Sequence, residues 1–145
     1  MLAWLEAFAG TRRGAAALFV LALAVFAVQS IAKPVAGGRD FGSYLGYYVQ
    51  MWDSRPADLS PLVARTPIAP LAIGVPLDIG GVAAVIWMAL LYAGSIVAWS
   101  WVALSFGRRA ALLTAALLLL YPGYGILFHG LSSDPIFAAA FASVR

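Results

Sequence analysis

The sequence predicts an all-α polytopic membrane protein, and three observations lead to this fold class. Hydrophobic residues make up 63% of the chain and charged residues 10%, whereas soluble domains are about 45–50% apolar and about 25% charged. The mean hydropathy is +0.93. The stretches 14–32, 79–107 and 110–133 contain no Lys, Arg, Asp or Glu, and a spanning helix needs about 20 predominantly apolar residues.

The composition also excludes several classes of site. The chain has no Cys and a single His, which excludes disulfides, thiolate metal sites, Cys nucleophiles and sites with several His ligands. Its net charge is +3, but the basic residues are scattered instead of forming the stripe that nucleic acid requires. Membrane topology and anionic lipid headgroups explain these charges better. We therefore expect membrane lipid, and no nucleic acid, among the partners.

The first span is expected at about 14–32, directly after Arg12 and Arg13. A cleaved export signal is the alternative, because a twin Arg, an apolar core and the small residues Ser30 and Ala32 would fit one. The core is long for such a signal, and further spanning segments follow it. We therefore favour an uncleaved helix.

Residues 33–78 form the expected long outer loop, which holds most of the prolines. Within it, apolar and aromatic residues recur at the spacing of one helix face, which predicts an amphipathic helix in the membrane interface. These residues are Phe41, Tyr44, Leu45, Tyr48, Val49 and Trp52. Five prolines follow and argue against a long regular helix, so we expect irregular backbone or short turns there. They lie at positions 56, 61, 67, 70 and 76.

The second span is expected at about 79–106. The tight basic turn "GRR" at 107–109 leads to the third span, at about 110–128. The segment "YPGYG" at 121–125 lies inside this third span, and we expect its proline and glycines to kink or end the helix within the membrane.

A fourth helix is expected to begin at about residue 134. The segment "LSSDP" at 131–135 carries a helix-start signal, with Ser133 or Asp134 as N-cap and Pro135 in the first turn. The residues that remain up to Arg145 are too few to cross a bilayer. We therefore expect the chain to be the amino-terminal portion of a larger protein.

The arginines predict the orientation of the spans. Four of them adjoin helix ends, and two of these fill a minimal turn, the placement that the positive-inside rule weights most. They are Arg12, Arg13, Arg108 and Arg109. We expect a multi-pass protein of the inner or plasma membrane, with a cytoplasmic N-terminus. The outer loop and the segment 129–135 then share the outer face. The residues that can converge there are Asp40, Arg39, Arg65, His129 and Asp134.

Several segments together resemble a known family. They are "RDFGSYLGYY" after the first span, "ARTPIAPLAIG" before the second, and "FGRRAALLTAALLLLYPGYGILFHGLSSDPIFAAAFA" across the third and fourth helices. In order and spacing they resemble the amino-terminal part of the GT-C membrane glycosyltransferases, nearest to the protein-mannosyltransferase-like and aminoarabinose-transferase-like enzymes. The resemblance implies a GT-C helix bundle. It also implies transfer of a sugar from a polyprenyl-phosphate carrier to an acceptor hydroxyl of protein, lipid or polysaccharide at the outer face.

The resemblance also implies roles for individual residues. Asp40 matches the acid of the first outer loop, the general base of an inverting displacement, and needs an ionised carboxylate beside the acceptor hydroxyl. Asp134 matches the second acid, which orients the acceptor, positions a cation or fixes a basic residue. Cationic donors stabilise the phosphate leaving group, and the substrate-binding candidates are Arg65, Arg39, Lys33 and His129.

The sequence assigns no definite cofactor, and a divalent metal stays open as an alternative. Many relatives place a second acid beside the loop acid, whereas the neighbours of Asp40 here are Arg39 and Phe41. This departure argues against a metal-binding pair of acids at that position.

Plainer interpretations stay open beside these roles. Asp40 and Asp134 both precede or begin predicted helices, where a carboxylate caps free backbone N–H groups. Arg65 is equally suited to lipid headgroups. A non-catalytic membrane subunit or a lipid-handling protein on the same scaffold is the alternative function. A transporter is disfavoured, because no charged residue lies within the three complete spans, where coupling residues are expected.

Overall fold

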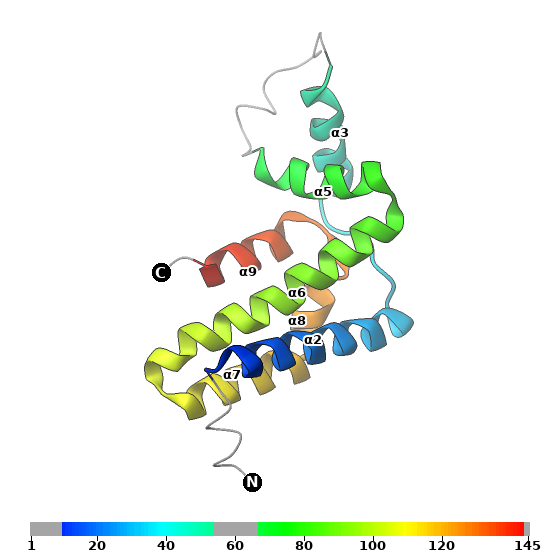
Figure 1. Cartoon of the computed structure of the whole chain (residues 1–145). Helices are drawn as coiled ribbons and strands as arrows, with labels where there is room; N and C mark the ends of the chain where they lie inside the picture. Colours follow the sequence, from blue (N-terminus) through cyan, green and yellow to red (C-terminus); the bar gives the residue numbers. More distant parts are fainter. Residues whose placement is uncertain (1–9, 54–66, 144–145) are drawn as a thin grey trace.

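The computed structural model describes residues 10–53 and 67–143, and within these ranges the chain is almost entirely helical (Figure 1). One short parallel pairing, β1 with β2, joins two connecting segments. The elements in chain order are α2 (Arg12–Ala32), β1 (Ala36–Gly37), α3 (Phe41–Met51), α5 (Ile68–Ile79), α6 (Gly81–Ala103), the 3-10 turn η1 (Leu104–Phe106), α7 (Arg108–Leu120), α8 (Pro122–Leu127), β2 (Gly130–Leu131) and α9 (Ser133–Ser143).

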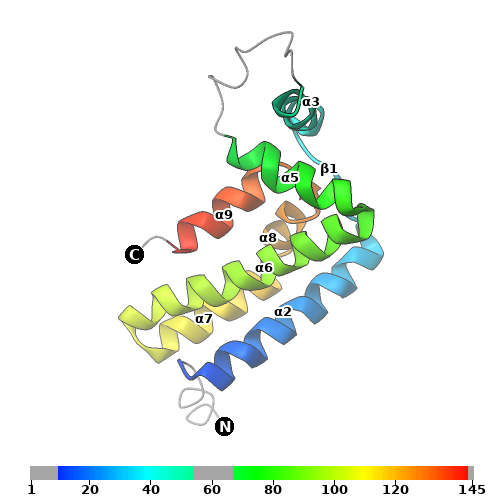
Figure 2. The same cartoon turned by 45° about the horizontal axis from the view of Figure 1, so that its top comes forward.

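Helix α6 is the centre of the bundle. It packs against α2, α5, α7 and α9, and Figures 1 and 2 both place it between α9 on one side and α2 with α7 on the other. Small and large residues alternate on its buried surface, where Ala84 and Ala93 lie among Met88, Tyr92 and Ile96. The small residues let neighbouring helices approach closely, while the large ones fill the space between them.

Aromatic rings form the core where α2, α6 and α8 meet. The ring centroids of Phe26 and Tyr92 lie 5.7 Å apart, and Tyr92 packs edge-on against Phe128 at 5.5 Å. Tyr124 adds a further ring 5.2 Å from Phe128, and its hydroxyl donates to the Ser95 hydroxyl at 2.8 Å. These separations are those at which aromatic pairs attract one another. The rings thus connect three elements into one core.

Within residues 10–53 and 67–143, two helices are long and apolar enough to cross a bilayer. They are α2 and the continuous segment Gly81–Phe106, which joins α6 to η1. Helix α2 matches the predicted helix at 14–32. The predicted helix at 79–106 begins later, at Gly81, because Ile79 ends α5 and Gly80 forms the turn between the two helices.

The interruption predicted in the third apolar segment is confirmed. Helix α7 ends at Leu120, Tyr121 adopts an extended conformation, and α8 begins at Pro122. Proline has no N–H to donate to the preceding turn and disfavours helical geometry in the residue before it. The expected helix over 110–128 is therefore two helices. Helix α9 begins at Ser133 with Asp134 in its first turn, which confirms that a fourth helix starts near residue 134. The expectation that Ser133 or Asp134 is its N-cap is wrong, because both residues lie inside the helix.

The amphipathic helix predicted in the outer loop is confirmed as α3. Tyr44 and Tyr48, one turn apart, are its buried residues, whereas Val49 and Trp52 are exposed. The predicted apolar face of this helix is therefore buried only in part, where α3 packs against α5, and the rest of it is exposed.

The expectation of irregular backbone after α3 is wrong for residues 68–79, which form helix α5. Pro67 is its N-cap and Pro70 lies in its first turn, where a backbone N–H has no helical acceptor and its loss costs nothing. Only Pro76 lies inside the helix, so a single hydrogen bond is lost. Two helices thus occupy much of the predicted loop 33–78.

Helices α3 and α5 are joined by one close contact. A Cβ added to Gly74 would lie 2.1 Å from Cγ of Tyr48, so the tyrosine ring packs directly on the glycine backbone. The Tyr48 hydroxyl donates to the Asp78 carboxylate, and this hydrogen bond is the main reason why the pKa of Tyr48 is raised. Gly80 (φ 142°, ψ 161°) then turns the chain from α5 into α6 in a conformation that only glycine adopts readily.

We expect Gly74→Ala to destabilise the protein by about 1–3 kcal/mol, because the new methyl group forces Tyr48 away from α5. Gly46→Ala is the matched control, since a Cβ there meets nothing within 4 Å. It should be neutral or stabilising by up to about 1 kcal/mol, as helix propensity predicts. Thermal unfolding of both variants in detergent measures the difference. Equal stabilities would contradict the packing of Tyr48 on Gly74.

Candidate functional site

The segment that carries Asp40 and the segment that carries Asp134 lie side by side. Strands β1 and β2 are parallel, with Ala36 opposite Gly130 and Gly37 opposite Leu131. The Ala36 N–H donates to the His129 carbonyl at 3.0 Å, and the Gly38 N–H donates to the Leu131 carbonyl at 3.2 Å. Because the strands are parallel, the residues that follow them leave at the same end of the pairing.

Contacts beyond the strands keep the two segments together. The Tyr44 hydroxyl, one turn after Asp40, donates to the Ser133 hydroxyl at 3.0 Å. A Cβ added to Gly38 would lie 3.1 Å from both the Gly130 carbonyl carbon and the Ser132 Cβ, so glycine permits this approach. Ser133 directly precedes Asp134. The structure therefore brings together the neighbourhoods of both predicted acids.

Asp40 has an unusual backbone conformation. Its φ of 60° and ψ of 12° lie in the left-handed region, and among the described residues other than glycine it alone has a positive φ. The Gly38 carbonyl accepts from the Phe41 N–H at 3.2 Å, so Asp40 lies in a tight turn, where Asp tolerates this geometry better than most residues. Such conformations cost roughly 1–3 kcal/mol and are frequent at functional sites.

Asp40 occupies the N-cap position of α3, but its side chain makes no capping hydrogen bond. The interpretation of its carboxylate as a helix cap is therefore wrong, because the left-handed backbone does not direct the side chain to the first-turn N–H groups. The residue is exposed, as is Asp134. Both carboxylates are thus accessible from outside the bundle.

Two of the predicted cations, Arg39 and Lys33, lie in the described part of the chain. Arg39 is exposed in the same turn as Asp40, and Lys33 is exposed at the C-cap of α2, three residues before β1. Arg65 lies outside the described residues. Two cations therefore flank the acid-bearing segment, and such side chains can stabilise a phosphate group.

His129 lies in the core, not at the surface. It is 2% exposed, and its ring stacks on Phe26 with centroids 4.3 Å apart. Its Nδ1 donates to the Gly125 carbonyl at 2.8 Å, because a carbonyl only accepts, and its Nε2 lies 3.2 Å from the Ser30 hydroxyl. Both ring nitrogens have partners within the protein, so this position does not support the substrate-binding role expected from the sequence.

The site offers carboxylates and cations without a preformed metal cage. Across the ranges 10–53 and 67–143, no group of three or more His, Cys, Asp or Glu is placed to bind a metal ion. An exposed carboxylate can accept a proton from a hydroxyl group, and neighbouring cations can stabilise negative charge on a leaving group. The arrangement therefore offers groups for proton transfer and for binding a negatively charged group.

Comparisons of the chain with protein-family models, with curated proteins and with solved structures found no match. Assignment to the GT-C glycosyltransferases therefore stays a prediction that rests on the sequence segments quoted above.

Sequence reasoning missed the pairing of β1 with β2 and the Tyr44–Ser133 hydrogen bond. Two-residue strands produce no detectable periodicity, and Tyr44 was placed only on an interfacial helix face. The available signal was the presence of glycines at 37, 38 and 130, since glycine permits close approach of two backbones.

The strand pairing can be tested directly, because the chain contains no native cysteine. We expect the double variant Ala36→Cys, Gly130→Cys to form an intramolecular disulfide under mild oxidation, since directly paired residues lie within disulfide range. A mobility shift on gels, reversed by reductant, measures it. The pair Ala16→Cys, Ala36→Cys should not crosslink, because Ala16 lies near the beginning of α2 and Ala36 lies in β1, beyond the other end of that helix. Equal crosslinking of both pairs would contradict the register.

A structural role for His129 predicts a specific loss of stability. His129→Phe keeps a ring on Phe26 but removes one of the two donors to the Gly125 carbonyl, which still accepts from the Phe128 N–H, and it removes the contact to Ser30. We expect a loss of about 0.5–1.5 kcal/mol, the usual net contribution of one hydrogen bond. Thermal unfolding in detergent measures it, with Tyr121→Phe at an exposed position as control. A variant as stable as the wild type would contradict this role.

Proposed function

We propose that this chain belongs to a membrane glycosyltransferase that moves a sugar from a polyprenyl-phosphate carrier to an acceptor hydroxyl. The observation that carries the proposal is the pairing of β1 with β2. The segment that carries Asp40 thereby lies beside the segment that carries Asp134, at one end of the bundle. Most of the chain separates the two residues in sequence. Accessible carboxylates with neighbouring cations are the groups that such a reaction requires.

The exposed surface of the bundle supports a multi-pass membrane location. The core helix of a soluble protein is mostly buried, but α2 fully buries only Ala22 and Phe26. Large apolar side chains face outward along its length, with Val28 67% exposed and Ile31 84% exposed. Leu120 at the end of α7 is 80% exposed. Exposed apolar surface of this extent is typical of lipid contact.

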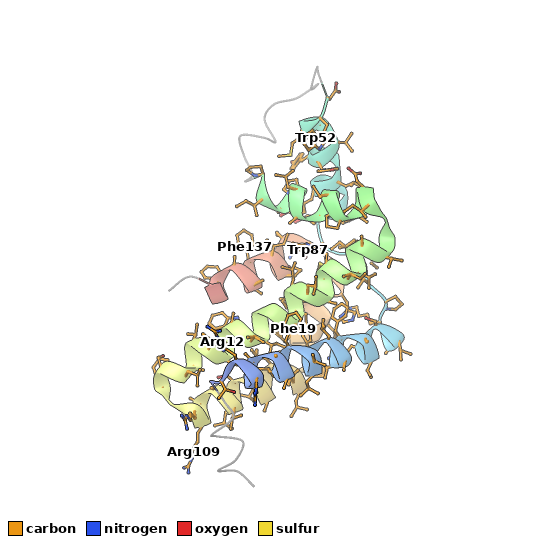
Figure 3. The ribbon with its side chains drawn as sticks, viewed as in Figure 1. Arg12, Phe19, Trp52, Trp87, Arg109 and Phe137 are labelled. Atoms are coloured by element: carbon orange, nitrogen blue, oxygen red, sulfur yellow. The ribbon has the colours of Figure 1, made fainter. Side chains whose placement is uncertain are left out.

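The proposed orientation puts the acids at the outer face of the inner or plasma membrane. Arg12 and Arg109 lie at one end of the bundle, close to the α6–α7 turn (Figure 3). Helices α3 and α5 lie at the opposite end in Figures 1 and 2. Arginines beside short turns favour the cytoplasmic side, so the segments of Asp40 and Asp134 face outward.

In the proposed reaction, the Asp40 carboxylate accepts the proton of the acceptor hydroxyl while that oxygen attacks the anomeric carbon. The bond between this carbon and the carrier phosphate oxygen breaks, and polyprenyl phosphate leaves with the electron pair. A single displacement inverts the configuration. Arg39 and Lys33, with Arg65 as predicted from the sequence, stabilise the phosphate. Asp134 orients the acceptor.

An apolar groove favours a second candidate function, lipid handling without catalysis. The groove lies between α5 and α6, has a volume of about 660 Å³ and is lined by apolar side chains, among them Leu71, Val75, Ile86 and Leu90. A surface of this kind suits a lipid chain whether or not a reaction follows. The two candidates differ in whether Asp40 is required for turnover.

We expect Asp40→Asn in the natural full-length protein to lower sugar transfer by about 10²–10⁴-fold, because the amide cannot accept the proton. Asn also tolerates left-handed geometry, so the fold is preserved. Transfer from radiolabelled polyprenyl-phosphate mannose and arabinose to membrane acceptors measures the effect, with Asp53→Asn as the matched loop control. Transfer at the wild-type rate in Asp40→Asn would overturn the assignment of Asp40 as base.

A further inference from the structure

A cavity lies at the end of the bundle opposite the two acids. It has a volume of about 220 Å³ and is formed by the beginning of α2, the end of α6 with η1, and the first turns of α7. Gly14, Ala15 and Leu18 line it from α2, while Ala111 and Ala115 line it from α7. Its walls are almost entirely apolar, and it belongs to no part of the proposed transferase site.

Small side chains explain why the cavity exists. The glycine and alanine residues of α2 and α7 are too small to fill the space between these helices. Leu104 also lines this space. The volume exceeds the roughly 150 Å³ of an apolar protein cavity that stays dry and accepts a benzene molecule. An apolar cavity of this size gains stability when hydrocarbon fills it, because its walls recover the dispersion contacts that empty space lacks.

Four arginines surround this end of the bundle. Two begin α2 and two begin α7, and all are exposed. Arg12 and Arg109 are both seen at this end in Figure 3. The set is Arg12, Arg13, Arg108 and Arg109.

Arg108 has a direct relation to the cavity. It lies three and seven residues before Ala111 and Ala115, so it continues the same face of α7 toward the helix end. In the ranges 10–53 and 67–143, all acidic residues lie in or beside other elements, near α3, α5 and α9. They are Asp40, Asp53, Asp78 and Asp134. Within these ranges the acids and the arginine cluster therefore belong to different parts of the bundle.

We propose that this end of the bundle binds an anionic phospholipid, with part of one acyl chain in the cavity and the phosphate at the arginines. An amphiphile with an anionic head and a hydrocarbon tail complements both features at once. A zwitterionic lipid carries the same tail, but its ammonium group is repelled by the four guanidinium groups. The first-turn N–H groups of α2 and α7 add to the attraction for phosphate.

The test compares lipids with identical acyl chains and different heads. The full chain is purified in detergent, and binding of phosphatidylglycerol and phosphatidylcholine is followed by native mass spectrometry and by thermal shift. We expect phosphatidylglycerol to bind at least about tenfold more tightly and to raise the melting temperature. Inorganic phosphate is tested in parallel. Equal binding of both lipids, or full stabilisation by phosphate alone, would overturn the proposal.

Two kinds of variant separate the head from the tail. Arg108→Gln should weaken phosphatidylglycerol binding about fivefold, which is the effect of one cation at an anionic surface. The difference in affinity between phosphatidylglycerol and phosphatidylcholine should therefore become smaller. Ala115→Leu fills the cavity and should weaken both lipids. The matched controls are Arg108→Lys, which keeps the positive charge, and Ala116→Leu at an exposed position of α7 outside the cavity, and neither should change the preference.

The cavity variant has its own safeguard against misfolding. If Ala115→Leu does not fold, as judged by circular dichroism, the smaller change Ala111→Val replaces it. Unchanged phosphatidylglycerol binding in Arg108→Gln together with a folded cavity variant would overturn the assigned site.

Discussion

The arrangement of the two acid-bearing segments depends on the buried ring of His129. The ring stacks on Phe26 in α2 and donates to the Gly125 carbonyl in α8, while the backbone carbonyl of the same residue accepts from Ala36. One residue thus joins the aromatic core to the strand pairing. Because a buried polar group without a partner is costly, its hydrogen bonds fix the ring in one orientation. The position of β1, and of Asp40 after it, follows from this anchor.

Some elements of the fold could be predicted from the sequence because local sequence features, and not long-range contacts, determine them. Helices α2 and α6 follow from the lengths of the uncharged stretches, and the break at Tyr121 follows from the local chemistry of Pro122. Helix α5 could not be predicted from the number of its prolines. Pro70 lies in the first turn, where its missing N–H has no helical acceptor, and Pro76 removes one hydrogen bond from a helix supported by its contacts with α3 and α6. The positions of the prolines therefore decide whether the segment forms a helix, more than their number does.

The candidate site shows the same division. The sequence predicts a cluster that includes Asp40 and Asp134. The structure brings their two segments together through a pairing of only two residues from each strand. The sequence places His129 among the substrate contacts because its segment is expected at the same outer face as Asp40. Its burial depends on Phe26 and Gly125, which periodicity does not place beside it. One end of the described bundle thus carries Asp40 and Asp134 together with Lys33 and Arg39, and the other end carries four arginines.

The strand pairing also has a consequence for how the protein is made. Residue 36 leaves the ribosome well before residue 130, and at about 5–20 residues per second the interval is about 5–20 s. Contacts between distant parts of a chain form only after both parts exist. Throughout that interval Asp40 lacks the segment that carries Asp134, although α2 and α3 have already been synthesised. Completion of the site is therefore among the last events in the biosynthesis of these helices.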